Sequence, residues 1–291
     1  MTVTVGVHAS NPSLYYLSRL GYLEEELAPL GETVSWHRYT NGVATGQLLA
    51  EGVLDFGGTG STPPITAQAD GHDIVYTAVS APRPDHGALL VTADGPAQSI
   101  ADLRGGTVAL AIGSWQTHFV AKALHAEGLA YGVDVTPKRS ESGEADRLAA
   151  GEIQGWVAQG AELQAALRSG DFRVLLRSGE VISDRSVFFS RRDFAEQSPE
   201  LVSAVVRALR RVDAWGAAQA HDAAAIAAED LGGSEADWYE ALSALPWKTE
   251  EVGDAFLAEQ QEAADILHSV GFVSRPVKIA DAVPAAHKEE N

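Results

Sequence analysis

The chain has 291 residues, and its hydrophobic content of 45% is enough for a sizeable core in one large domain or two lobes. Its 40 acidic residues outnumber 21 basic ones, and the net charge of −19 argues against nucleic acid and anionic membrane surfaces as partners, because both need basic patches. The absence of cysteine excludes disulfides, thiolate catalysis, zinc–cysteine sites and iron–sulfur clusters.

The sequence carries no obvious targeting or membrane segment. No apolar run is long enough to cross a bilayer, so we expect no direct membrane insertion. The N-terminus has neither a basic n-region nor an apolar h-region, and a lipoprotein anchor cysteine is absent. We expect a cytoplasmic protein if the sequence is the native full length, and an extracytoplasmic one if it is a trimmed mature form.

The first third of the chain alternates strands and helices, which is typical of a mostly parallel sheet with helices on both faces. Strands are predicted over residues 3–7, 33–39, 53–57 and 74–79, and helices over 11–27, 41–50 and 62–69. The turn-rich stretch 81–85 then suits a crossing between two lobes.

The middle of the chain repeats this pattern, and the last third is almost wholly helical. The predicted strands cover residues 87–92, 108–112, 133–137, 153–158 and 172–176, with a helix from Gly113-Ser114-Trp115 to about residue 127. Residues 187–189 carry the chain back to the first lobe. Ser198-Pro199 then begins a long helix, because proline suits the first helical position, and a second long helix covers 250–270.

The stretch 54–65 reads as a short buried strand, a glycine-rich turn and a helix opened by a Ser/Thr cap with proline in its first turn. The first amides of a helix have no partner inside the helix and carry the positive end of its dipole. Such an end can hold a small oxyanion without a charged side chain. An ordinary strand-to-helix turn is the alternative interpretation, and this motif alone does not separate the two.

Several segments, in this order along the chain, resemble the sulfonate, taurine and nitrate class of ABC-transporter solute-binding proteins, and the aliphatic-sulfonate group most closely. The segments that carry the resemblance are 27–31, 49–57 with Thr59-Gly60 and 63–65, 99–105, 148–153 and 192–195. The resemblance covers the chain from about residue 3 to 275 in the family's order, so the set is specific for the fold and moderately specific for the class of ligand.

The resemblance implies an α/β fold of the periplasmic-binding-protein type 2 kind, in which each of two lobes is a mostly parallel sheet flanked by helices. Lobe 1 would hold residues 1–84 and 187–291, including the helical C-terminal tail, and lobe 2 residues 85–186. The ligand, a small organic oxyanion and in the first place a sulfonate, would lie in a cleft between the lobes. The implied partner is an ABC permease, and we expect a monomer without cofactor or metal.

A sulfonate is a permanent anion with three acceptor oxygens, so its site needs several convergent donors. Three predicted helix starts directly follow strands, at the edge where open α/β sheets place ligands. They predict ligand contacts for Ser10, Asn11, Gly60, Ser61, Thr62, Ser114 and Trp115. Helix capping alone is the alternative for Ser10 and Asn11, and packing in the core or the cleft wall is the alternative for Trp115.

Three further residues complete the predicted site. Arg83 lies in the crossing and could pair with an anion when the lobes close, a surface position being the alternative. At 154–161 the chain departs from the family pattern, because Gln154-Gly155 stands where Asp-Ala is common and Gln159-Gly160-Ala161 replaces an aspartate–proline part. Trp156 and Gln159 could still face the cleft.

The alternative function is an intracellular enzyme on the same fold, acting on a sulfur-containing or heterocyclic small molecule. Gly113-Ser114-Trp115 and the Phe-Gly-Gly at 56–58 also look similar to the aryl-sulfinate desulfinase of this superfamily. That enzyme uses a cysteine nucleophile near the first strand, where this chain has His8. Its mechanism cannot operate here, so His8 and His118 would be the acid–base candidates of a different chemistry.

Overall fold

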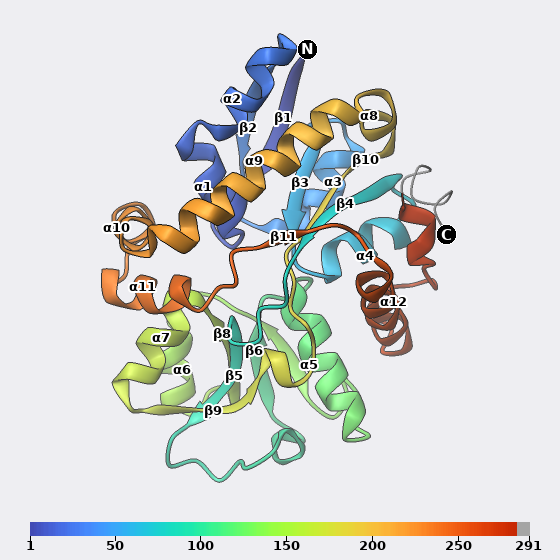
Figure 1. Cartoon of the computed structure of the whole chain (residues 1–291). Helices are drawn as coiled ribbons and strands as arrows, with labels where there is room; N and C mark the ends of the chain where they lie inside the picture. Colours follow the sequence, from blue (N-terminus) through green and yellow to red (C-terminus); the bar gives the residue numbers. More distant parts are fainter. Residues whose placement is uncertain (284–291) are drawn as a thin grey trace. The chain divides into compact units, whose positions relative to one another are not determined.

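The computed structural model describes residues 1–283, so the last eight residues of the predicted tail lie outside the described part of the chain (Figure 1). The strands are β1 (Thr2–Val7), β2 (Thr33–Arg38), β3 (Phe56–Thr59), β4 (Ile74–Ser80), β5 (Gly87–Thr92), β6 (Thr107–Leu110), β7 (Thr136–Arg139), β8 (Gly155–Gln159), β9 (Phe172–Arg177), β10 (Val187–Arg191) and β11 (Thr249–Glu250).

The α-helices follow the strands in the order that the sequence predicts over the first two thirds of the chain. They are α1 (Pro12–Leu20), α2 (Tyr22–Leu27), α3 (Thr45–Ala50), α4 (Thr62–Ala69), α5 (Trp115–Ala126), α6 (Glu144–Ala149), α7 (Gly160–Ser169), α8 (Arg192–Gln197), α9 (Pro199–Ala218), α10 (Ala220–Leu231), α11 (Glu235–Ser243) and α12 (Asp254–Ser269). Among the described helices, none is both long enough and apolar enough to cross a membrane.

The chain forms two compact units. Unit 1 consists of Met1–Ala81, Arg185–Ala218 and the described residues 247–283, and unit 2 consists of Pro82–Asp184 and Gln219–Pro246. The second of these unit 2 segments differs from the predicted lobes, in which all of 187–291 belonged to lobe 1. The reason is that α11 packs on α7, where Arg168 forms ion pairs with Asp237 and Glu240.

Unit 1 contains a six-stranded sheet in the order β11-β4-β10-β3-β1-β2. Strand β1 pairs in parallel with β2 on one side and β3 on the other, whereas β10 is antiparallel to both β3 and β4. The connection leaving β1 runs to β2 and the connection leaving β3 runs to β4, in opposite directions along the sheet. This reversal lies beside the carboxyl ends of β1 and β3, where open α/β sheets bind ligands.

Unit 2 contains a five-stranded sheet in the order β7-β6-β8-β5-β9 with the same reversal. Strand β6 pairs in parallel with β7 and with β8, and the antiparallel strand β5 lies between β8 and β9. The carboxyl ends of β6 and β8 thus correspond to those of β1 and β3 in unit 1. The topology of each unit therefore provides one sheet edge of the kind at which open α/β sheets bind ligands.

The long helix α9 lies beside α1 and α2 in unit 1 (Figure 1). Its apolar residues at helical spacing, Leu201, Val205, Leu209 and Val212, are all buried. The predicted helix over 11–27 is instead divided into α1 and α2, because Gly21 adopts a left-handed conformation with φ of 71°. Strand β3 begins three residues later than predicted, at Phe56.

Gly58 lies where three segments approach one another in unit 1. A Cβ atom added to it would lie 2.5 Å from Cδ1 of Phe188 and 2.9 Å from Nδ2 of Asn11. Real Cβ contacts are longer than this, so any larger residue must displace its neighbours. The glycine therefore permits the close packing of β3 against β10 and the start of α1.

We predict that Gly58→Ser destabilises the protein by about 1–3 kcal/mol through overpacking. Gly253→Ser is the matched control, because Gly253 is extended, has open space around its Cα and precedes α12 as the cap residue. Urea unfolding followed by circular dichroism should show a near-neutral effect at Gly253. Equal stability of the two variants would contradict the packing argument.

Candidate functional site

The candidate site in unit 1 is built from the residues that directly follow β1 and β3. His8 directly follows β1, and Asn11 caps α1 after a two-residue turn. Gly60 and Ser61 follow β3, and Thr62 begins α4. The structure thus brings most of the predicted unit 1 residues to the same edge of the sheet, beside the reversal of winding direction. Ser10 lies in the turn and is exposed.

Asn11 caps α1 through its side-chain oxygen, and its side-chain nitrogen is a donor that no described residue uses. Its Oδ1 accepts a hydrogen bond from the main-chain N–H of Leu14 at 3.1 Å, which fixes the orientation of the side-chain amide. Its Nδ2 is buried and has no hydrogen-bond partner among the described residues. The side chain is only 1% exposed, so capping and a donor role coexist in one residue.

The start of α4 differs from the predicted capped helix. Ser61 is the cap residue by position, but it has helical backbone angles and its side chain makes no capping hydrogen bond. The reason lies in the sequence, because a cap accepts from the N–H groups of the second or third helical residue and these are Pro63 and Pro64. The main-chain donors at this helix start are therefore limited to Gly60, Ser61 and Thr62.

Thr62 supplies a second unused group. It is fully buried at the first position of α4, and its Oγ1 has no hydrogen-bond partner among the described residues. Its carbonyl oxygen accepts from the hydroxyl of Thr66 at 3.2 Å, as expected within a helix. Buried polar atoms without partners are rare and costly, so each needs an explanation.

His8 carries the third such atom. Its Nε2 lies 2.9 Å from the carbonyl oxygen of Gly58, while its buried Nδ1 has no partner among the described residues. Burial lowers the pKa of His8, and the hydrogen bond to Gly58 opposes this only in part. The ring packs beside Tyr39 at 5.4 Å between centroids. As an acid–base candidate, His8 is therefore a neutral imidazole at pH 7.

The candidate site in unit 2 lies where β6 and β8 end. Ser114 caps α5, because its Oγ accepts from the main-chain N–H of Gln116 at 3.2 Å. Gln159, at the end of β8, accepts through Oε1 from Trp115 Nε1 at 2.9 Å and from Gln116 Nε2 at 3.2 Å. Both donors fix the orientation of the Gln159 amide, so its NH2 group points away from them.

Arg83 is not a surface cation. It is 5% exposed, its Nε donates to the carbonyl oxygen of Asp184 at 2.9 Å, and its Nη2 pairs with Asp184 Oδ1 at 2.9 Å. His86 Nδ1 lies 2.7 Å from Oδ2 of the same carboxylate. The expected pairing of Arg83 with a ligand anion is therefore replaced by a buried ion pair within unit 2.

This buried network sets the charges beside Trp115. Burial raises the pKa of Asp184, but Arg83 and His86 outweigh it and hold that pKa below its usual value. Burial, followed by Arg83, lowers the pKa of His86, whose ring lies 5.6 Å from that of Trp115. His86 thus lies between the Trp115 ring and the Asp184 carboxylate, which stays ionised at pH 7.

Trp156 does not line the predicted site. It is 2% exposed and packs edge-to-face against Phe172, with 6.5 Å between ring centroids, in a core cluster of unit 2. Its neighbour Val157 belongs to a different cluster on the other face of β8. Trp156 is therefore a core residue, and the expectation that it faces a ligand is wrong. Gln159 keeps its place at the strand end.

Sequence reasoning missed Gln116, His86 and Asp184. Gln116 immediately follows the predicted Trp115, and its Oε1 accepts from the main-chain N–H of Ala111 at 2.7 Å, which holds the turn before α5. Its position as a polar residue in the first turn of a predicted helix was a local signal from which the sequence could have indicated Gln116. The partnership of His86 with Asp184, 98 positions apart, left no such local signal.

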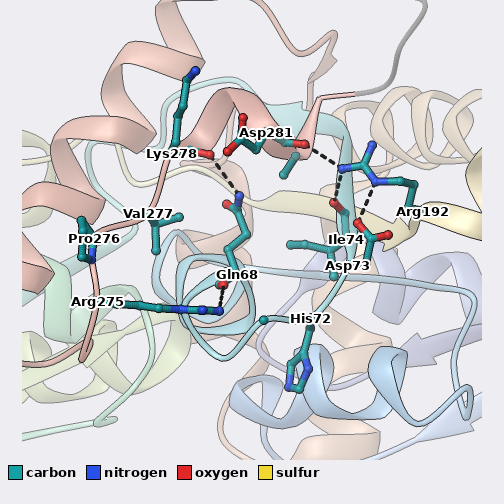
Figure 2. Close-up of a pocket in the computed structure, with 12 residues that line it drawn as sticks. Gln68, His72, Asp73, Ile74, Arg192, Arg275, Pro276, Val277, Lys278 and Asp281 are labelled. Carbon is teal, nitrogen blue, oxygen red and sulfur yellow. Dashed lines mark hydrogen bonds and ion pairs between the residues drawn. The ribbon is translucent and has the colours of Figure 1, made fainter.

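A separate hollow of about 370 Å³ in unit 1 contains several cations, among them Arg192, Arg275 and Lys278 (Figure 2). Arg275 donates to the carbonyl oxygens of Ala69 and Gln68, which are the last carbonyls of α4. Arg192 pairs with Asp73 at 2.7 Å and donates to the carbonyl oxygen of Asp281. Both guanidinium groups thus join the chain after α12 to α4 and β4, which is a structural role.

Comparisons with known proteins support the sequence-based resemblance. The NMT1/THI5-like family matches residues 13–225, and the chain belongs to this family. A protein of Escherichia coli (strain K12), provisionally named aliphatic sulfonates-binding protein, is 30% identical over 254 residues, which cover 86% of this chain and 79% of that protein.

Two solved structures confirm the predicted fold class, the α/β fold of periplasmic binding proteins. The periplasmic aliphatic sulphonate binding protein SsuA from Escherichia coli is 27% identical, with a TM-score of 0.87 over 97% of this chain and 91% of that chain. The alkanesulfonate-binding protein SsuA from Xanthomonas axonopodis pv. citri, bound to MOPS, is 24% identical, with a TM-score of 0.86 over 97% of each chain. The second likeness concerns the fold alone.

His118, the other acid–base candidate, makes stability depend on pH. Burial, followed by Lys122, lowers the pKa of His118 to about 3. A histidine in the unfolded chain titrates near its ordinary value, so the unfolded state takes up a proton that the folded state does not. Stability is therefore lost as pH falls below about 6.5, by about 2 kcal/mol by pH 5.

We expect His118→Gln to lose less stability than the wild type between pH 7 and pH 5, by about 2 kcal/mol. Urea unfolding at the two pH values measures this difference. His125→Gln removes an exposed histidine of the same helix and is the control. The same loss in His118→Gln as in the wild type would show that His118 does not cause the pH dependence.

Proposed function

We propose that this protein binds a small organic oxyanion, a sulfonate, as the solute-binding component of an ABC-type importer. Its relatives named for sulfonate binding support the class of ligand. We expect its partner to be a membrane permease and the protein itself to be a monomer. Enclosure of the ligand between two lobes stays a prediction of the resemblance.

One observation carries the proposal for unit 1. Two buried side-chain groups that can donate, Asn11 Nδ2 and Thr62 Oγ1, have no partner among the described residues, and both belong to helix starts at the edge beside β1 and β3. The main-chain N–H groups at the start of α4 add donors whose partial charge does not titrate. A sulfonate supplies the acceptor oxygens that these groups lack.

Local donors must outweigh the repulsion that a net charge of −19 exerts on an anion. Each hydrogen bond to a charged group contributes about 1.5–3 kcal/mol. Three such bonds contribute about 4.5–9 kcal/mol, and a dissociation constant of 1 μM corresponds to about 8 kcal/mol, so micromolar binding needs at least three bonds near the strong end of this range. Salt screens the long-range repulsion more strongly than these short bonds.

Unit 2 offers a candidate set of its own. The Gln159 NH2 group is oriented away from its two partners, Trp115 and Gln116, and Ser114 caps the helix α5 on which both partners lie. We propose these two residues as polar contacts for a ligand, with Trp115 as an apolar neighbour. The indole is held by its hydrogen bond to Gln159 and is 5% exposed, so its contribution is mainly to position Gln159.

A thermal-shift screen tests the function directly. We expect alkanesulfonates to raise the melting temperature in proportion to the logarithm of their concentration, because they bind only the folded state. Nitrate and arylsulfonates test how small and how large an anion the site accepts, and a neutral pyrimidine tests whether the ligand must be charged. A shift with the pyrimidine and none with any oxyanion would overturn the proposal.

Asn11→Asp tests the site at the level of one atom. Aspartate keeps the oxygen that caps α1 but replaces the Nδ2 donor by a second carboxylate oxygen. We predict that ethanesulfonate binds this variant at least about 100-fold more weakly, through the lost bond and the added repulsion. Isothermal titration calorimetry measures the change.

Asn41→Asp is the matched control for Asn11→Asp. Asn41 also caps a helical turn, accepting from the main-chain N–H of Val43 at 3.0 Å, but it is exposed. The control adds the same charge at an exposed position, where solvent screens it. An equal loss of affinity in both variants, or unchanged affinity in Asn11→Asp, would argue against a sulfonate site at this edge.

A further inference from the structure

The protonation state of His8 follows from its hydrogen bond. A carbonyl oxygen can only accept, so the Nε2 that lies 2.9 Å from the Gly58 oxygen carries the ring hydrogen. Burial lowers the pKa of His8, which keeps the ring neutral at pH 7. In a neutral imidazole the second nitrogen is an acceptor, so Nδ1 presents a lone pair and no hydrogen.

The neighbours of His8 do not use this lone pair. Thr45 donates its hydroxyl hydrogen to the carbonyl oxygen of Gly42 at 2.7 Å, so Tyr39 must donate to Thr45 Oγ1 at 2.5 Å. The Tyr39 hydroxyl hydrogen is therefore committed, although its ring packs beside His8. Nδ1 stays buried without a partner among the described residues.

The unit 1 edge thus combines unused donors with one unused acceptor. Asn11 Nδ2 donates, Thr62 Oγ1 can donate, and His8 Nδ1 only accepts. Asn11 Nδ2 and His8 Nε2 both approach Gly58, one beside its Cα and the other at its carbonyl oxygen, so the two side chains lie around the same residue. A sulfonate head has acceptor oxygens alone and cannot satisfy the imidazole.

We infer that the ligand carries, besides its sulfonate head, a hydroxyl or amino group that donates a hydrogen bond to His8 Nδ1. This inference rests on the proposed function and specifies its substrate class as short hydroxyalkane- or aminoalkanesulfonates. His8 is only 5% exposed, so a ligand reaches Nδ1 only if neighbouring groups are displaced locally. A small donor group requires the smallest displacement. His8 then determines specificity, while Asn11 and Thr62 hold the anion.

Calorimetric titrations at pH 7.5 with ethanesulfonate, 2-hydroxyethanesulfonate and 2-aminoethanesulfonate test this inference. We expect the wild type to bind at least one of the two substituted ligands about tenfold or more tightly than ethanesulfonate. Equal affinity for all three, or a preference for ethanesulfonate, would overturn the inference. The comparison uses the wild type, so it does not depend on the folding of a variant.

His8→Gln assigns the preference to Nδ1. The glutamine amide can keep the donor to the Gly58 oxygen, but it has no acceptor at the position of Nδ1. We expect this variant, measured with all three ligands, to bind the substituted sulfonates no more tightly than ethanesulfonate, whatever its absolute affinity for ethanesulfonate. A preference that persists in folded His8→Gln would show that another group recognises the donor.

A pH series separates this inference from a charged His8. If a sulfonate oxygen bound Nδ1 directly, His8 would have to be protonated, and ethanesulfonate would bind more tightly with proton uptake as pH fell from 8 to 6. Tyr39, the titratable neighbour of the ring, has its pKa raised to about 12 by burial and stays neutral throughout. Such tightening would overturn the inference and leave the proposed function standing, whereas binding of no sulfonate at all would overturn both.

Discussion

The reversal of winding direction beside β1 is the constraint on which the unit 1 site depends. Because the connection from β1 runs to β2 and the connection from β3 runs the other way to β4, the connections at the carboxyl ends of β1 and β3 diverge and leave helix starts side by side. Polar groups at those helix starts then lie at the same edge of the sheet and are not used in the hydrogen bonds of the sheet or the helices. Strand β6 imposes the same arrangement on unit 2, so two unrelated sequences, 8–11 and 114–116, meet the same demand.

The two units meet this demand with different chemistry. At its candidate edge, unit 1 leaves three buried groups without partners among the described residues, namely His8 Nδ1, Asn11 Nδ2 and Thr62 Oγ1. Unit 2 joins its groups to one another, since Gln159 receives two hydrogen bonds from the first turn of α5. Unmet groups cost stability in the unliganded protein, and a ligand that satisfies them recovers that cost as affinity. We therefore place recognition chiefly in unit 1 and rigidity chiefly in unit 2.

Local signals in the sequence were sufficient for the fold and for part of the site. The start of α4 at Thr62 and the caps Asn11 and Ser114 follow from residue types that favour helix starts. The burial of Trp156 was not predictable in this way, because all but the last residue of β8 are buried and no alternation separates its two faces. The pairing of Arg83 with Asp184 joins positions 101 residues apart, so only the folded chain shows that this cation is already used.

Pro63 and Pro64 have a consequence for how this protein can be observed. A proline contributes no amide resonance to a proton–nitrogen spectrum, so the start of α4 is represented there by Gly60, Ser61 and Thr62 and then by Ile65. Glycine amides commonly resonate apart from the crowded centre of such spectra. Gly60 is thus a natural spectroscopic probe at the helix end where the anion would bind, and in 15N-enriched protein it requires neither an attached tag nor an introduced cysteine.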